Sequence, residues 1–124
     1  MLILVPQASV NAASTKKVTG INRFDYAYQV LDKVNAERKK VGSPELTMDE
    51  ELLKSAMLRA AECRVSFSHT RPGGGLCFTI CEKMYGENIA YGYSSPKAVM
   101  NGWMNSDGHR KNILNSGYSS VGIG

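Results

Sequence analysis

Residues 103–114 read WMNSDGHRKNIL. Ser106 is typical of the residue that caps a helix, because its hydroxyl accepts a hydrogen bond from a free backbone N–H of the first turn. We therefore expect a short helix that begins at Ser106 and continues to Leu114. His109 lies in the first turn of this helix, where the dipole disfavours a charged imidazole and keeps the ring available as a ligand.

The first periodic segment of the chain covers residues 22–41. Apolar side chains recur there at three- and four-residue steps and predict an amphipathic helix. The apolar stripe consists of Phe24, Ala27, Tyr28, Leu31 and Val34. Asn35 and Arg38 continue this stripe, and polar groups that pack against other elements need hydrogen-bond partners. We expect both side chains to bind loop carbonyls.

A second helix is predicted from the pattern Thr47-x-x-Glu50, a capping box in which each side chain satisfies a free backbone donor. It is expected to end near residues 64–66. Its buried stripe is predicted to consist of Leu52, Leu53, Ala56, Ala60 and Cys63. Two further helical segments are predicted, one over residues 78–84 and one that begins at Ser95-Pro96, with serine as cap and proline at the first helical position.

Two segments are predicted to be non-helical. Residues 67–75, FSHTRPGGG, hold a proline and three consecutive glycines, so we expect them to turn or to approach another group closely. Residues 121–124, VGIG, alternate apolar and small side chains like the beginning of a strand. Nothing in the sequence offers this strand an obvious partner.

The N-terminal residues bear on the location of the protein. Residues 2–5 are apolar but much shorter than the about 20 residues that span a bilayer. Val10-x-Ala12 is a small-residue pattern that a signal peptidase accepts. We interpret residues 1–20 as the remnant of a secretory signal peptide with a disordered tail, and residues 21–124 as the folded domain. The alternative is a disordered tail that carries no signal.

Size and charge exclude some classes of function. A chain of 124 residues has room for one domain. The net charge is +4, but the basic residues are scattered. The densest basic stretch, residues 38–40, lies at the end of a predicted helix, where it favours the helix dipole. We therefore predict that the protein does not bind nucleic acid. We also expect a monomer that does not span a membrane.

The chain has three cysteines, Cys63, Cys77 and Cys81. In a secreted protein we expect either one disulfide with one thiol left over or small buried thiols, and the sequence does not settle the pairing. A zinc site formed by the three thiols and His69 has suitable ligand types. Its spacings match no common zinc pattern, which favours the other readings.

Four motifs follow one another along the chain. They are FSHTRPG at 67–73, GENIA at 86–90 with Gly92, Trp103-x-x-Ser106-x-Gly108-His109-Arg110-x-Asn112-Ile113-Leu114 and VGIG at 121–124. The two predicted helices before them contribute Asn35-x-Glu37-Arg38 with Leu46, and Leu52-x-x-x-Ala56-x-x-Arg59-Ala60. In these motifs and their order the chain resembles, over residues 22–124, the bacterial CAP domains (cysteine-rich secretory, antigen and pathogenesis-related proteins, also called SCP-like).

The resemblance implies an α+β fold, a three-layer α/β/α sandwich with a small antiparallel sheet. It also implies secretion to the extracellular space. Family domains continue beyond the Gly-x-Gly pattern with a turn and another strand, so we expect this domain to be incomplete at its C-terminus. In the family two histidines and two glutamates line a central cleft. The first histidine matches His69, the first glutamate Glu87 and the second histidine His109, while Ser106 takes the place of the second glutamate.

These residues suggest a metal site. Two imidazoles and a carboxylate are suitable ligands for zinc or another divalent cation, so His69, Glu87 and His109 are the predicted ligands. The alternative is a structural network in which the three groups hydrogen-bond one another.

The predicted function is an extracellular binding module. Eukaryotic family members bind sterols and other lipids, and a small hydrophobic ligand or an extracellular protein is the expected partner. A candidate lipid groove consists of Phe78, Met84, Tyr85, Tyr91 and Tyr93. The alternative, which we favour, is that these side chains pack in the core and the loops. One alternative is a hydrolase or protease, either metal-dependent or with Ser106 as nucleophile, His109 as base and Glu87 orienting the ring. A second is an adhesion or signalling protein in which the cleft is structural.

Overall fold

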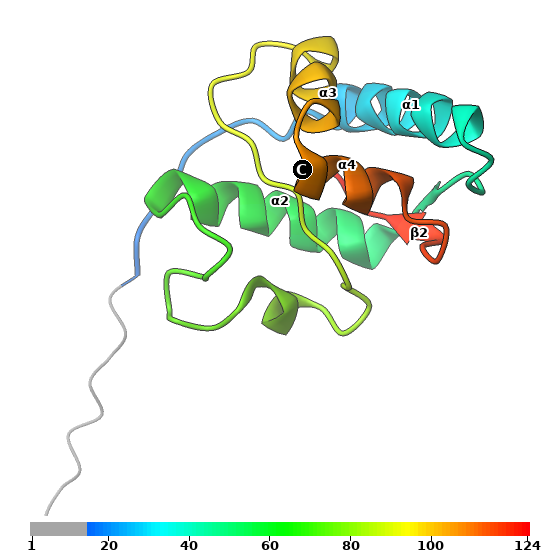
Figure 1. The fold of residues 1–124 in the computed structure, drawn as a ribbon. Coiled ribbons are helices and arrows are strands. Elements are labelled where there is room, and N and C mark those ends of the chain that lie inside the picture. The colour runs from blue at the N-terminus through cyan, green and yellow to red at the C-terminus, as the bar shows by residue number, and fades with distance from the viewer. Residues whose placement is uncertain (1–14) are drawn as a thin grey trace, which may run out of the picture.

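The computed structural model describes residues 15–124 (Figure 1). The elements are α1 (Phe24–Lys40), β1 (Thr47–Met48), α2 (Glu50–Val65), the 3-10 helix η1 (Cys77–Ile80), α3 (Pro96–Met104), α4 (Asp107–Leu114) and β2 (Ser120–Val121). Residues 15–20 are exposed and form no helix or strand, and most of the predicted signal remnant lies outside the described residues. Within residues 15–124 no helix combines the length and apolar character needed to cross a bilayer.

The structure has an α+β fold with helices on both sides of a small sheet (Figure 1). Helices α1, α3 and α4 pack together on one side. The hydrophobic core between them and β1 is formed by Val30, Leu31, Val34, Leu46, Met100 and Ile113. Val121 and Ile123 pack against this core, whereas the intervening Gly122 faces α2. A Cβ at Gly122 would lie 2.0 Å from the carbonyl carbon of Leu52, so only glycine allows α2 to approach this closely.

The two strands run parallel, with Thr47 opposite Ser120 and Met48 opposite Val121. The predicted antiparallel sheet is therefore wrong for the described residues. The partner of the C-terminal strand is the short segment between α1 and α2, which has no strand pattern of its own in the sequence. The chain passes through α2, α3 and α4 between the two strands and returns in the same direction, as a parallel pair requires.

Helix α1 confirms the role predicted for two polar residues. Arg38 is fully buried and donates to the carbonyls of Pro44 at 2.7 Å, Ile113 at 2.8 Å, Asn115 at 2.8 Å and Tyr118 at 3.1 Å. Asn35 forms a two-way bond with the backbone of Leu46, at 3.0 Å and 2.8 Å. The contact face of α1 is centred on Val30 and Val34. Phe24 and Tyr28 lie outside this face and are half exposed, which corrects the predicted stripe.

Helix α2 differs from its prediction at both its start and its face. Its cap is Asp49, whose carboxylate accepts from the N–H groups of Glu51 and Leu52, so the predicted capping box does not form. Thr47 is instead part of β1. The buried residue of α2 is Arg59, while the predicted apolar stripe is half-buried and Ala60 is exposed. The predicted helix at 78–84 is a single 3-10 turn, η1. Helix α3 begins as predicted, with Ser95 accepting from Ala98.

Candidate functional site

His69 is presented by a hairpin that follows α2. Thr70 and Leu76 form an antiparallel bridge, and the N–H of Cys77 donates to the carbonyl of His69 at 2.9 Å. Gly74, in the predicted glycine-rich loop, closes the hairpin with a φ of 94°, a left-handed conformation that favours glycine. The side chain of His69 remains 56% exposed at the end of this hairpin.

Glu87 lies on the segment that links η1 to α3, and Arg59 of α2 holds it by both carboxylate oxygens. Nε of Arg59 is 2.8 Å from Oε2, and Nη2 is 3.1 Å from Oε1. The two side chains are 4% and 7% exposed. Burial by itself would raise the pKa of Glu87, but the hydrogen bonds from Arg59 and His69 outweigh it and lower the pKa below its usual value. Glu87 is therefore a buried, ionised and oriented carboxylate.

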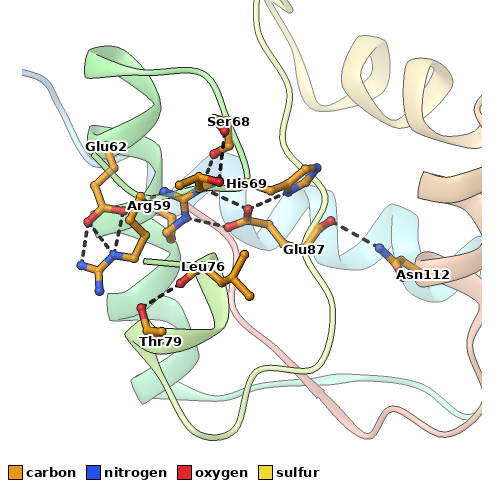
Figure 2. A network of polar contacts seen from close by, with 10 residues as sticks. Arg59, Glu62, Ser68, His69, Leu76, Thr79, Glu87 and Asn112 are labelled. Atoms are coloured by element: carbon orange, nitrogen blue, oxygen red, sulfur yellow. Dashed lines mark hydrogen bonds and ion pairs between the residues drawn. The ribbon is translucent and has the colours of Figure 1, made fainter. Parts of the chain in front are cut away.

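A second ion pair fixes the hairpin to α2. Arg59 also donates to Glu62 at 2.7 Å and to the carbonyl of Ser68 at 2.7 Å. Arg71, in the hairpin, forms a fork with the same carboxylate, Nη2 to Oε1 at 2.7 Å and Nε to Oε1 at 3.0 Å. The hydrogen bonds from Arg71 lower the pKa of Glu62. Figure 2 shows this continuous network from Glu62 through Arg59 to Glu87.

The network ends at the imidazole of His69. Nδ1 of His69 lies 2.9 Å from Oε1 of Glu87 (Figure 2). Because an ionised carboxylate only accepts hydrogen bonds, Nδ1 carries a proton, and in the neutral ring the lone pair is therefore on Nε2. Nε2 points away from Glu87 and is the nitrogen that can bind a ligand. A carboxylate that orients a histidine in this way is typical of metal-binding histidines.

The second histidine belongs to α4. Nδ1 of His109 lies 2.9 Å from the hydroxyl of Ser106. Ser106 occupies the cap position predicted for it, but its hydroxyl makes no capping bond and contacts the imidazole instead. Asn88 donates to the carbonyl of His109 at 3.0 Å, and Asn112 donates to Asn88 at 2.9 Å. These bonds connect α4 to the segment that carries Glu87.

The four predicted site residues line one small cleft with a volume of about 220 Å³. Its lining consists of His69, Glu87, Asn88, Ser106, Gly108, His109 and Asn112. Among residues 15–124, three potential metal ligands whose atoms lie within 4.8 Å of one another are His69, Cys77 and Glu87, and His109 does not join them. The predicted ligand set of His69, Glu87 and His109 thus shares a cleft, with Glu87 engaged by Arg59.

All three cysteines are free thiols. Cys77 and Cys81 are buried, and Cys63 is half-buried. Burial and the negative charge of Glu87 raise the pKa of Cys77, which keeps it a thiol at neutral pH. Among the described residues Cys77 alone of the three joins His69 in a ligand group, so the zinc site of three thiols and His69 does not form. Arg59 was not predicted as a site residue, and Cys77 was considered only as part of the zinc site of three thiols and His69.

A second, larger and open groove has a volume of about 680 Å³, and we call it the aromatic groove. Its lining consists of Cys63, Arg64, Phe67, Ile89, Ala90, Tyr91 and Tyr93. The rings of Phe67 and Tyr91 lie 6.1 Å apart and tilted by 55°. Tyr91 and Tyr93 were predicted to line a lipid groove. The other predicted members, Phe78, Met84 and Tyr85, do not line this one.

Comparisons with known proteins place the fold. The model of the cysteine-rich secretory protein family, CAP, matches residues 31–124. The uncharacterised protein YkwD of Bacillus subtilis is 38% identical over 128 residues, which cover 95% of this chain and 50% of YkwD. The secreted protein RBT4 of Candida albicans is 28% identical over 94% of this chain and 29% of its own length.

Solved structures agree with this match. The structure of an extracellular protein with an SCP domain from Bacillus anthracis superposes with a TM-score of 0.75 at 27% identity, over 86% of this chain and 41% of that one. The chain thus spans about half the length, or less, of the proteins that it matches.

Proposed function

Since the chain belongs to the cysteine-rich secretory protein (CAP) family, we propose that it is an extracellular binding module whose polar cleft holds a divalent transition-metal ion between His69 and His109. The observation that carries this proposal is the bond between Nδ1 of His69 and Glu87, which is itself held by Arg59. This bond fixes the tautomer and leaves Nε2 of His69 directed away from the carboxylate.

The chemistry of the cleft favours zinc, copper or nickel. Neutral imidazole suits these ions, whereas magnesium and calcium prefer oxygen ligands. Glu87 was predicted as a ligand, but both of its oxygens already accept hydrogen bonds from Arg59 or His69. We therefore assign Glu87 to orienting His69. Two protein ligands leave coordination positions open for water or for a ligand of the module.

The extracellular part of the proposal has separate support. RBT4 is named a secreted protein and the Bacillus anthracis structure is named extracellular. The small-residue pattern Val10-x-Ala12 in the N-terminal segment agrees with export.

The serine-type hydrolase gains less support from the geometry. Ser106 and His109 are in contact at 2.9 Å, but Glu87 is bonded to His69 and Arg59 instead of His109. Among the described residues His109 therefore lacks a carboxylate in the orienting role that a nucleophilic triad uses. A metal-dependent hydrolase would use the same two imidazoles as the proposed site.

Zinc titration by calorimetry tests the proposal. The chain has only two histidines, so no other imidazole competes for the ion. We expect one ion per chain, and at least about ten-fold weaker binding in His69→Ala, in His109→Ala and in the orienting variant Glu87→Gln. The matched control is Lys111→Ala, an exposed position on α4. Binding that both histidine variants retain would contradict the proposal.

Cobalt separates the imidazole site from the thiols. Co²⁺ bound by thiolate has a strong near-ultraviolet charge-transfer band, and Co²⁺ bound by imidazole and water lacks it. We expect a spectrum without this band. A thiolate band that disappears in Cys77→Ser would instead assign the ion to the group of Cys77, His69 and Glu87.

A further inference from the structure

The segment between η1 and α3 has one edge fixed by side chains. The carbonyls of Tyr85, Glu87 and Ile89 accept hydrogen bonds from the helical layer of α3 and α4 and from the loop that follows α4. The donors are Tyr118 Oη at 3.2 Å, Asn112 Nδ2 at 3.3 Å and Trp103 Nε1 at 3.4 Å, in that order. Alternate carbonyls that face the same way are the pattern of an extended strand, in which neighbouring residues direct their backbone groups to opposite edges.

Within residues 15–124, the opposite edge of this segment has no hydrogen-bond partner. Gly86, Asn88 and Ala90 alternate with the three fixed residues, so their backbone groups point to the other side. No backbone N–H from residues 85–94 donates to a protein group within residues 15–124, and the same range offers no donor to the carbonyls of Asn88 and Ala90. Residues 86–90 are half-buried. An unpaired edge of this kind is a template on which another extended chain can pair.

The aromatic groove meets this edge at Ala90, whereas Asn88 lines the polar cleft. Ile89 and Ala90 line it from the segment, and Cys63, Arg64 and Phe67 line it from the end of α2 and the residues that follow. Arg64 is exposed and forms no ion pair with any residue from 15 to 124. The groove therefore combines backbone donors and acceptors, aromatic surface and one unpaired positive charge.

We propose that the aromatic groove binds an extended acidic peptide, which pairs with the free edge at Asn88 and Ala90 as an added strand. In this mode the main-chain bonds supply affinity and pockets for alternate side chains supply specificity. An apolar side chain of the peptide packs on Phe67 and Tyr91, and an acidic side chain pairs with Arg64. A fatty chain would leave the backbone groups of the edge without partners, which favours a peptide as the occupant.

The test begins with an array of heptapeptides in which aromatic or aliphatic residues alternate with Asp or Glu, beside a matched array with Lys or Arg. Binding is measured in EDTA, so that the result does not depend on the metal site. We expect binders in the acidic array. The best of these is then titrated by fluorescence anisotropy, together with a copy that is N-methylated at alternate residues. Because N-methylation removes backbone donors and keeps the side chains, we expect the copy to bind at least about five-fold more weakly.

Two protein variants locate the site. Ala90→Pro removes one free N–H that bonds no described group, so we expect unchanged thermal stability and about five-fold weaker peptide binding. Arg64→Glu is expected to weaken binding of the acidic peptide about three- to ten-fold. Its matched control is Lys54→Glu, the same charge change at an exposed position of α2 outside the groove, with binding retained.

Four results would overturn the proposal. In the first, no peptide of the acidic array binds the protein. In the second and third, the N-methylated copy binds as tightly as the parent peptide, or Ala90→Pro binds the peptide as tightly as the unmodified protein. In the fourth, tri-N-acetylglucosamine or a 16-carbon fatty acid binds in the groove and no peptide does. The last result would assign the groove to a glycan or to a lipid.

Discussion

Replacement of Arg59 by methionine tests how the site is held together. The side chain of Arg59 is 4% exposed, and its partner Glu87 is 7% exposed. Methionine retains most of the length of arginine but none of its hydrogen bonds, so the variant leaves a buried carboxylate with His69 alone. Loss of one partner of a buried ion pair costs about 3–5 kcal/mol. We expect the free energy of unfolding of Arg59→Met to fall by this amount at pH 7.

The assay is urea unfolding followed by circular dichroism, with a double-mutant cycle. Adding Glu87→Gln to Arg59→Met removes the unpaired charge, so we expect the double variant to be more stable than Arg59→Met. If Arg59→Met alone does not fold, the recovery of a folded protein in the double variant tests the same point. The control is Arg23→Met, which breaks an exposed ion pair with Asp25 and should cause no measurable loss. A loss below about 1 kcal/mol in Arg59→Met, as for an exposed pair, would refute the reasoning.

Three further predictions concern the contact of Gly122 with α2, the ionisation of Glu87 and the reactivity of the cysteines. Gly122→Ala should lower the melting temperature strongly and Gly73→Ala should not, because a Cβ meets α2 at Gly122 and has nothing within 4 Å at Gly73. The lowered pKa of Glu87 stabilises the fold at pH values above the usual pKa of a glutamate, and this stabilisation is lost as the pH falls from about 5 through the lower, folded pKa. Glu87→Gln should therefore flatten the loss of stability below about pH 5, and an unchanged acid profile there would count against this. A thiol reagent should modify half-buried Cys63 before buried Cys77, and the reverse order would contradict the observed burial.

Some tertiary contacts could be predicted from the sequence, namely those of a polar side chain on an otherwise apolar helix face. Arg38 and Asn35 are polar residues on an apolar stripe, and the structure confirms that both bind loop carbonyls. Arg59 carries the same signal on the predicted stripe of α2, three residues after Ala56 and four before Cys63. A charged residue among alanines and leucines at helical spacing points to a buried ion pair, and Arg59 forms one.

Other features depend on geometry that spacing does not fix. Ser106 lies three residues before His109, which allows its hydroxyl either to cap α4 or to contact the imidazole, and the structure has the contact. Cys77 meets His69 only because the hairpin places the two residues across from each other. The parallel pairing of β1 and β2 rests on strands of two residues each, which leave no periodic signal in the sequence.

The central claim is that Nε2 of each histidine binds the metal ion while Glu87 holds Nδ1 of His69. Long-range ¹H–¹⁵N correlation spectra of the imidazole rings, recorded before and after the addition of zinc, test it most directly. We predict that the Nε2 resonances of His69 and His109 shift, and that Nδ1 of His69 remains protonated throughout. A shift of Nδ1 of His69, or no change in either ring at saturating zinc, would contradict the account.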